Sequence, residues 1–254
     1  MTQQHEAPRR EPHDEGFLAI YEKWISESAY VEEVMTRLRP LLAGQKTMLD
    51  VGAGTGVFTF LAPQDIAVTA VEPSCEMRRQ IEARAEETGR SVRFSSVRWE
   101  ETDVPERAYD IVLSANSIYR MEPLRDNLLK MHRTARNAIL LVMNGRTETG
   151  IYGRMRQALR VADIPCRKPP LGHTLADVKR TLDELAIAYE EELVSWTDEV
   201  RFATEQEALR HLEAKLGVWI TSESADVLLP FFVDGDDSLT LQDDITMAFL
   251  TIRI

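Results

Sequence analysis

Leu49-Asp50-Val51-Gly52-Ala53-Gly54-Thr55-Gly56-Val57-Phe58 is the stretch that decides the fold of this chain. An apolar run gives way to three glycines at every second position, which predicts a strand, a tight loop and the start of a helix. Glycine lets backbone N–H groups approach a ligand that a Cβ would exclude, and a helix N-terminus favours negative charge. The stretch therefore predicts a ligand-binding loop.

The composition is that of a globular chain with an excess of negative charge. Of its 254 residues 44% are hydrophobic, and 42 acidic residues against 30 basic ones give a formal net charge of −12. Such a surface disfavours phosphate backbones and anionic membranes, so we expect a small-molecule substrate and neither a nucleic-acid nor a membrane partner. The oligomeric state stays open, with a homodimer among the alternatives.

The two cysteines, Cys75 and Cys166, lie far apart in the sequence. They match neither a zinc-type spacing nor a disulfide framework, so we expect no metal site and a reducing, cytoplasmic environment. The first residues are too polar for a signal peptide, and no apolar run approaches the roughly 20 residues of a membrane span.

The N-terminal part divides into a polar leader and an aromatic helical segment. Residues 1–16 are rich in charge and poor in large apolar side chains, which predicts disorder. Over residues 17–44 apolar side chains recur at spacings of three and four, which predicts one broken helix or two. With its tyrosines and a tryptophan, this segment is either a helix packed on the core or a lid over the pocket.

Five short apolar or β-branched runs follow, and they alternate with amphipathic helical patterns. This alternation predicts a parallel sheet with right-handed crossovers, whose ligands bind at the carboxyl ends of the strands. The loops expected to converge there are Asp50–Gly56, Glu72, Trp99-Glu100 and Asn116–Tyr119.

Two common cofactors are excluded by the spacing of the glycines. A nicotinamide fingerprint has a glycine at its sixth position, but counted from Gly52 or Gly54 that position holds Val57 or Thr59. A Walker A loop needs a lysine after its last glycine, and no lysine follows Gly56. The pattern that is left is Asp-x-Gly-x-Gly-x-Gly.

On these residues the chain resembles the class I S-adenosylmethionine-dependent methyltransferases over residues 46–145. The resemblance rests on Leu49–Gly56, on Val71-Glu72-Pro73-Ser74, and on Tyr109-Asp110-Ile111-Val112 with the loop after it. It implies an α/β fold with a doubly wound, seven-stranded and mostly parallel sheet whose last strand is antiparallel. The closing strands would lie at 187–197 and 245–254. The cofactor would be S-adenosyl-L-methionine and the product S-adenosyl-L-homocysteine.

The resemblance also implies how the cofactor is held. Asp50 and the loop amides would bind the methionine amine and carboxylate, and Glu72 would accept both ribose hydroxyls. Adenine would lie where related chains carry an aspartate followed by a small residue, and this chain departs from that pattern with Arg98 and Trp99. The predicted cofactor-binding residues are Asp50, Gly52, Ala53, Gly54, Gly56, Glu72, Pro73, Trp99, Glu100 and Asn116.

The acceptor side is less readable, because in-line methyl transfer needs an aligned nucleophile and no invariant catalytic residue. Amide and adenine-amine methyltransferases of this fold carry an Asn/Asp-Pro-Pro-aromatic loop, and Asn116-Ser117-Ile118-Tyr119 lacks both prolines. Tyr119 is a weak catalytic candidate, and Arg120 could hold a substrate carboxylate. The predicted substrate-binding residues are Tyr21, Trp24, Tyr30, Tyr119 and Arg120.

The predicted domain organisation is an N-terminal helical lid over 17–44 and a methyltransferase domain over 45–254, with a helical insertion at about 198–235 before the last strand. This layout resembles methyltransferases of small metabolites, so we expect methyl transfer to a nitrogen, oxygen or carbon atom of a small molecule. Two alternatives stay open: a cofactor-binding but inactive regulatory or interaction partner, and aminopropyl transfer on the same fold.

Overall fold

The structure is a computed structural model that describes residues 15–145, 150–166, 172–235 and 238–254. Most of the predicted leader lies outside the described residues, and the first helix begins at Glu15. The helices are α1 (Glu15–Glu27), α2 (Tyr30–Leu42), α3 (Val57–Leu61), α4 (Cys75–Thr88), α5 (Leu124–Thr134), α6 (Ile151–Val161), α7 (Leu175–Glu184), α8 (Glu205–Leu216) and α9 (Ser222–Leu228), with 3-10 turns η1 (Trp99–Glu101), η2 (Ile118–Arg120) and η3 (Leu229–Phe231).

The strands form one mixed sheet. They are β1 (Thr47–Val51), β2 (Ala67–Val71), β3 (Arg93–Ser95), β4 (Tyr109–Ala115), β5 (Ala135–Asn144), β6 (Glu190–Phe202), β7 (Val233–Asp234) and β8 (Leu239–Arg253). Their order is β3-β2-β1-β4-β5-β8-β6, and the short β7 pairs with β8. Strands β1 to β5 are parallel, whereas β8 runs antiparallel to both of its neighbours, β5 and β6. The predicted fold class is confirmed.

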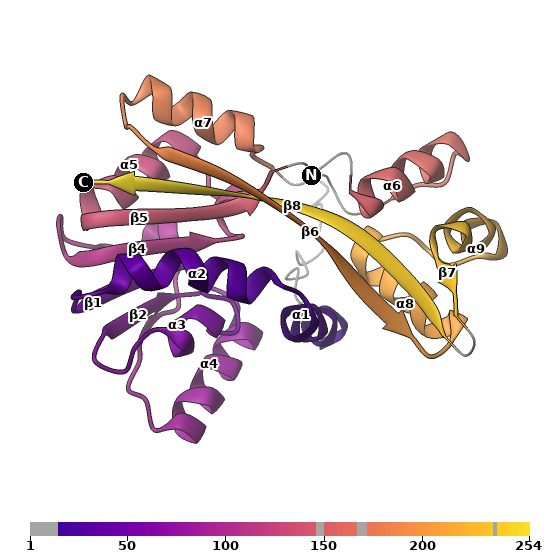
Figure 1. Cartoon of the computed structure of the whole chain (residues 1–254), viewed down its shortest axis with the longest axis horizontal. Helices are drawn as coiled ribbons and strands as arrows, with labels where there is room; N and C mark the ends of the chain where they lie inside the picture. The colour runs from indigo at the N-terminus through magenta and orange to yellow at the C-terminus, as the bar shows by residue number, and fades with distance from the viewer. Residues whose placement is uncertain (1–14, 146–149, 167–171, 236–237) are drawn as a thin grey trace, which may run out of the picture.

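Helices cover both faces of the sheet, as Figure 1 shows. The helices α2, α3 and α4 pack on one face, whose core includes Met48 and Leu140, and α5 and α7 pack on the other, whose core includes Leu49 and Leu141. Capping residues that the sequence predicts are in place: the Ser74 hydroxyl accepts from the Met77 N–H at the start of α4, and Thr174 forms a full capping box before α7. No described helix is long and apolar enough to cross a membrane.

Beyond the residues of β8 that pair with β5, the strands β6 and β8 continue as a two-stranded ribbon. This ribbon and the helices α6, α8 and α9 enclose a second core, and we call this part of the structure the cap (Figure 1). Residues 198–202, predicted to belong to the helical insertion, are strand, and β8 begins at Leu239 rather than at 245. The reason is that apolar alternation continues beyond the sheet: Val200 pairs with Leu241, and both are buried. The cap core consists of Ile151, Met155, Leu159, Val200, Phe202, Ala208, Leu212, Leu216, Val218, Leu228, Phe232 and Leu241.

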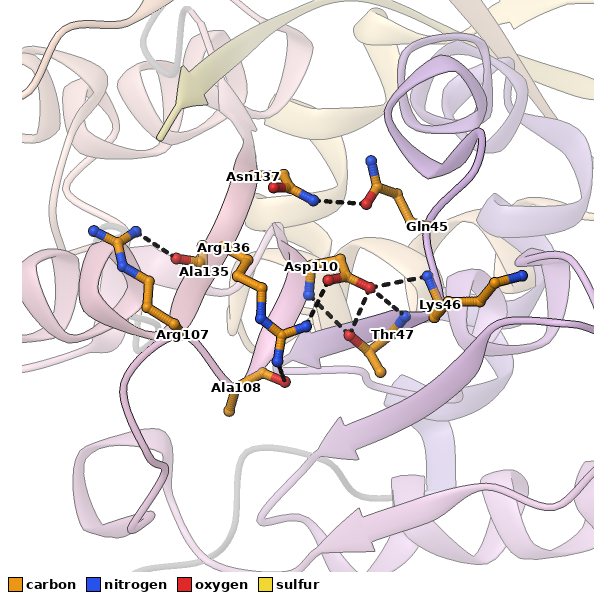
Figure 2. Close-up of polar contacts among 9 residues, drawn as sticks. All are labelled: Gln45, Lys46, Thr47, Arg107, Ala108, Asp110, Ala135, Arg136 and Asn137. Atoms are coloured by element: carbon orange, nitrogen blue, oxygen red, sulfur yellow. Dashed lines mark hydrogen bonds and ion pairs between the residues drawn. The ribbon is translucent and has the colours of Figure 1, made fainter.

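A polar network joins the amino ends of β1, β4 and β5, as Figure 2 shows. One oxygen of the buried Asp110 carboxylate accepts from the Lys46 and Thr47 N–H groups at 2.9 and 3.0 Å and from the Thr47 hydroxyl. Its other oxygen lies 2.7 Å from the Arg136 guanidinium. Because each strand start is tied to the next, this network fixes the relative positions of the strands that lead to the opposite edge.

Candidate functional site

The glycine loop follows β1 at the carboxyl edge of the sheet. Gly52, Gly54 and Gly56 have φ values of 73°, 57° and 80°, which only glycine adopts without strain. The loop is pinned to the next strand because the Gly52 and Ala53 N–H groups donate to the Val71 carbonyl at 2.8 and 3.1 Å. A Cβ on Gly52 would overlap the Cβ of Ser117, so the loop also packs directly against the end of β4.

Glu72 stands at the end of β2 and is only 7% exposed. Its Oε2 accepts from the Gly54 N–H at 2.9 Å, and its Oε1 accepts from the Ser74 N–H at 2.8 Å. These bonds fix the carboxylate in one orientation beside the loop. An ionised carboxylate accepts hydrogen bonds from hydroxyl groups, so a ligand hydroxyl beside Glu72 would find an acceptor of fixed direction.

Asp50, the last polar residue of β1 before the loop, is completely enclosed. Its Oδ2 accepts from the Thr59 hydroxyl at 2.8 Å, and its side chain is 1% exposed. Burial raises the pKa of Asp50 to about 7; the hydrogen bond from Thr59 opposes this shift, and the charge of Glu72 adds to it. A cation beside Asp50 would reverse the shift.

The end of β4 forms the second wall of this region. Asn116 has a left-handed φ of 53°, held by a hydrogen bond from its N–H to the Val142 carbonyl at 2.8 Å. Next to it, the Ser117 hydroxyl donates to the Val51 carbonyl at 2.7 Å. Burial raises the pKa of the neighbouring Tyr30 well above its ordinary value, and the Asn116 side chain opposes this shift.

Aromatic side chains from the N-terminal helices lie over the loop. A Cβ on Gly54 would be 3.5 Å from the Tyr21 hydroxyl of α1. Tyr21 is followed by Trp24 at 6.2 Å between ring centroids, and Trp24 stacks on Tyr30 at 4.7 Å. Burial raises the pKa of Tyr21, and the charges of Asp50 and Glu72 raise it further. Burial also raises the pKa of Tyr119, and the nearby Tyr21 raises it further.

Two buried side-chain oxygens at this edge have no hydrogen-bond partner within the described part of the chain. They are Thr55 Oγ1, which follows β1, and Asn116 Oδ1, which follows β4. An unsatisfied buried polar group costs about 1–3 kcal/mol. Their shared position at the carboxyl edge indicates that a polar ligand completes the site.

The structure does not gather every predicted residue. Pro73 is exposed, and so is Arg120. Trp99 is 2% exposed and packs in the core under α5, with Lys130 Nζ 4.3 Å from its ring centroid. Glu100 accepts from the Glu122 N–H at 3.2 Å. The roles of these residues at adenine or at the acceptor stay predictions.

Comparisons with known proteins were made for the sequence and for the structure. The family model described as a methyltransferase domain matches residues 48–137, which span the glycine loop, Glu72 and the end of β4. Over these residues the chain is similar to a methyltransferase domain. S-adenosylmethionine is the methyl donor of such a domain, and the fixed Glu72 carboxylate, the close-packed glycines and the unpaired polar atoms fit it.

Solved structures show the same fold at low sequence identity. A putative methyltransferase from Bacillus halodurans is 17% identical, with a TM-score of 0.58 over 86% of this chain and 97% of that one. A geranyl diphosphate methyltransferase in complex with the cofactor is 17% identical, with a TM-score of 0.52 over 96% and 93% of the two chains. A putative sarcosine dimethylglycine methyltransferase from Galdieria sulphuraria is 12% identical, with a TM-score of 0.53 over 94% and 98%. Among curated proteins, none matches the sequence.

Three residues at or near the candidate site were not selected from sequence: Thr55, Ser117 and Asp198. Thr55 stands between two loop glycines, and a polar side chain so placed could have been chosen. Asp198 interrupts an apolar alternation on β6, where its carboxylate accepts from the Trp24 indole at 3.1 Å. Ser117 has no sequence signal, because its importance comes from a close approach to Gly52 across two strands.

Proposed function

We propose that this chain transfers the methyl group of S-adenosylmethionine to a small-molecule acceptor in the space bounded by the glycine loop, the end of β4 and helix α1. The observation that carries the proposal is the position of Tyr21, which lies over Gly54 at the cofactor loop. A helix in this position would shield the reacting atoms from water, which favours a small acceptor over a polymer. The acidic net charge also disfavours nucleic acid.

Individual residues would hold the cofactor as follows. Glu72 accepts the ribose hydroxyls, and the amides of the glycine loop together with Asp50 bind the methionine carboxylate and ammonium. Thr55 and Asn116 supply the side-chain oxygens that lack a partner among the described residues. When bound, the cofactor supplies an electrophilic methyl group on a sulfonium. The chain contributes alignment of the nucleophile and exclusion of water.

The acceptor side is formed by aromatic groups. Tyr21, Tyr30 and Tyr119 come from three different elements, and their hydroxyls influence one another's ionisation. Because burial raises all three pKa values, these hydroxyls stay protonated near neutral pH and act as hydrogen-bond donors or acceptors. They would orient the acceptor rather than remove its proton. Cys75 and Cys166 lie far apart in the sequence and match no disulfide framework, which supports a cytoplasmic location.

Two experiments test this proposal. Isothermal titration with S-adenosylmethionine measures binding, and a tritium-methyl screen over metabolite fractions, with nucleic acid and protein as parallel acceptors, measures transfer. We expect binding and label in a small metabolite. Binding without transfer to anything would favour the inactive regulatory partner, and label in nucleic acid or protein would contradict the small-molecule assignment. Product mass distinguishes a methyl from an aminopropyl adduct.

A further inference from the structure

Asp198 joins helix α1 to the cap. This β6 carboxylate is 6% exposed and accepts two indole N–H groups: Trp24 of α1 at Oδ2, 3.1 Å, and Trp196 of its own strand at Oδ1, 2.8 Å. Hydrogen bonds to a carboxylate acceptor are stronger than bonds between two neutral groups. The bond from Trp196 orients the carboxylate, and the bond from Trp24 ties α1 to it.

Further contacts support the same joint. Lys23, one residue before Trp24, donates to the Arg201 carbonyl at 2.9 Å and lies 3.6 Å from the Glu207 carboxylate of α8. On β8, Asp243 is the residue directly opposite Asp198, and its carboxylate accepts from the Ile151 N–H at the start of α6. The paired strands therefore connect α1 on one side with the helices of the cap on the other.

The same helix reaches the cofactor loop. One turn before Trp24, the Tyr21 hydroxyl lies 3.5 Å from the position of a Cβ on Gly54. Figure 1 shows α1 between the sheet and α8, near the point where β6 and β8 extend beyond β5. A rigid helix that is fixed at Trp24 has its Tyr21 position fixed as well.

We propose that Asp198 is a positioning residue: through Trp24 it holds α1 over the glycine loop, so that a ligand bound at the loop also stabilises the cap. The inference rests on the proposed function, because that ligand is the cofactor bound at Gly52–Gly56. It assigns Asp198 no contact with the reacting atoms. Its effect is carried by the helix.

Two tryptophan variants form a matched pair for the test. Trp24→Phe removes the N–H that crosses to Asp198 and keeps an aromatic ring to stack on Tyr30. Trp196→Phe removes the other N–H from the same carboxylate and leaves the bond to α1. Hydrogen–deuterium exchange is measured for each full-length protein with and without S-adenosylhomocysteine, and affinity is measured by isothermal titration.

In the wild type we expect the ligand to slow exchange both at the glycine loop and in α8. In Trp24→Phe the loop should still be protected, protection of α8 should disappear, and affinity should fall roughly tenfold, the effect of one hydrogen bond to a charged group. Trp196→Phe should retain protection of α8. A merely structural Asp198 would raise exchange with and without ligand alike and preserve the difference between the two states.

The proposal is overturned if Trp24→Phe keeps the ligand-dependent protection of α8, if both variants lose it, or if bound ligand protects the loop but never α8. If no ligand binds, the proposed function itself fails. Should Trp24→Phe not fold, as judged by circular dichroism, Asp198→Ala replaces it, because it removes the acceptor of the Trp24 indole altogether. Loss of α8 protection in Asp198→Ala that is absent in Asp198→Glu would support the proposal, and unchanged protection in Asp198→Ala would reject it.

Discussion

The two edges of one sheet treat their polar groups in opposite ways. At the amino edge, Asp110 is surrounded by donors from the start of β1 and from Arg136 (Figure 2). Burial would raise the pKa of Asp110, but the hydrogen bonds from Lys46, Arg136 and Thr47 outweigh it and lower the pKa. At the carboxyl edge, the same kind of buried carboxylate, Asp50, receives one side-chain hydroxyl and has its pKa raised to about 7.

This difference separates what holds the fold from what binds. The network around Asp110 is complete without a ligand, so it stabilises the strands. The carboxyl edge leaves Thr55 Oγ1 and Asn116 Oδ1 buried without partners in the described structure, which costs stability unless a ligand supplies them. Substitutions at the first edge should therefore change unfolding, and substitutions at the second should change cofactor affinity.

The largest effect is expected at Glu72. Glu72→Ala removes the fixed acceptor for the ribose hydroxyls and releases the Gly54 N–H, so affinity for S-adenosylhomocysteine should fall by more than about 100-fold. Isothermal titration measures it. Asp110→Asn is the matched control from the opposite edge, and its affinity should match the wild type. Equal affinity of Glu72→Ala and wild type would make the ribose assignment wrong.

The mirror experiment removes the carboxylate of the amino edge. Asp110→Ala leaves the Lys46 and Thr47 N–H groups and the Arg136 guanidinium without their acceptor. It should therefore lower the free energy of unfolding by about 2–3 kcal/mol. Urea titration followed by circular dichroism measures this. Below the unfolding transition, cofactor affinity should not change. A stability equal to that of the wild type would show that the network contributes nothing.

Asp50 should make cofactor affinity depend on pH. An ammonium group binds the ionised carboxylate, whose pKa is about 7, so affinity should be roughly tenfold weaker at pH 6 than at pH 8. Without ligand the sign is opposite: the folded pKa lies above the ordinary 3.8, so the stabilising contribution is present below about pH 4 and is lost as pH rises through 7. Asp50→Asn should abolish both dependences, and a dependence that persists in this variant would exclude Asp50 as the titrating group.

The smallest effect is expected at Thr55. Thr55→Val keeps the shape and removes a buried hydroxyl that has no partner in the described structure, so the ligand-free chain should be unchanged or up to about 1 kcal/mol more stable. Affinity for S-adenosylhomocysteine should fall by about threefold to tenfold. Thermal unfolding with and without ligand measures both. A variant that is less stable and binds normally would mean that this hydroxyl serves the fold.

Much of the sheet was predictable because its signals are local. The strands β1 and β2 are short runs that end directly before Gly52 and before Glu72-Pro73, and Ser74 and Thr174 cap helices as their positions predict. The cap was not predictable in the same way. The amphipathic face of α6, with Met155 and Leu159, shows that it packs on something, but not that its partners lie after β6.

In the candidate site, too, local sequence signals predicted some residues and missed those that depend on contacts between distant segments. The glycines and Glu72 could be chosen because their positions follow from backbone requirements at strand ends. Trp99 was chosen by its place after β3, but position along the chain does not give the direction of a side chain, and its indole lies in the core. Asp198 acts across the fold through Trp24, a relation between segments that local spacing does not contain.

The cofactor specificity of the glycine loop is tested most directly by isothermal titration of the purified wild-type chain with S-adenosylhomocysteine, NAD and ATP in parallel. The glycine spacing and the carboxyl edge described here predict saturable binding of S-adenosylhomocysteine at one site per chain and no binding of the other two. No measurable binding of S-adenosylhomocysteine, or equally tight binding of NAD or ATP, would contradict this prediction.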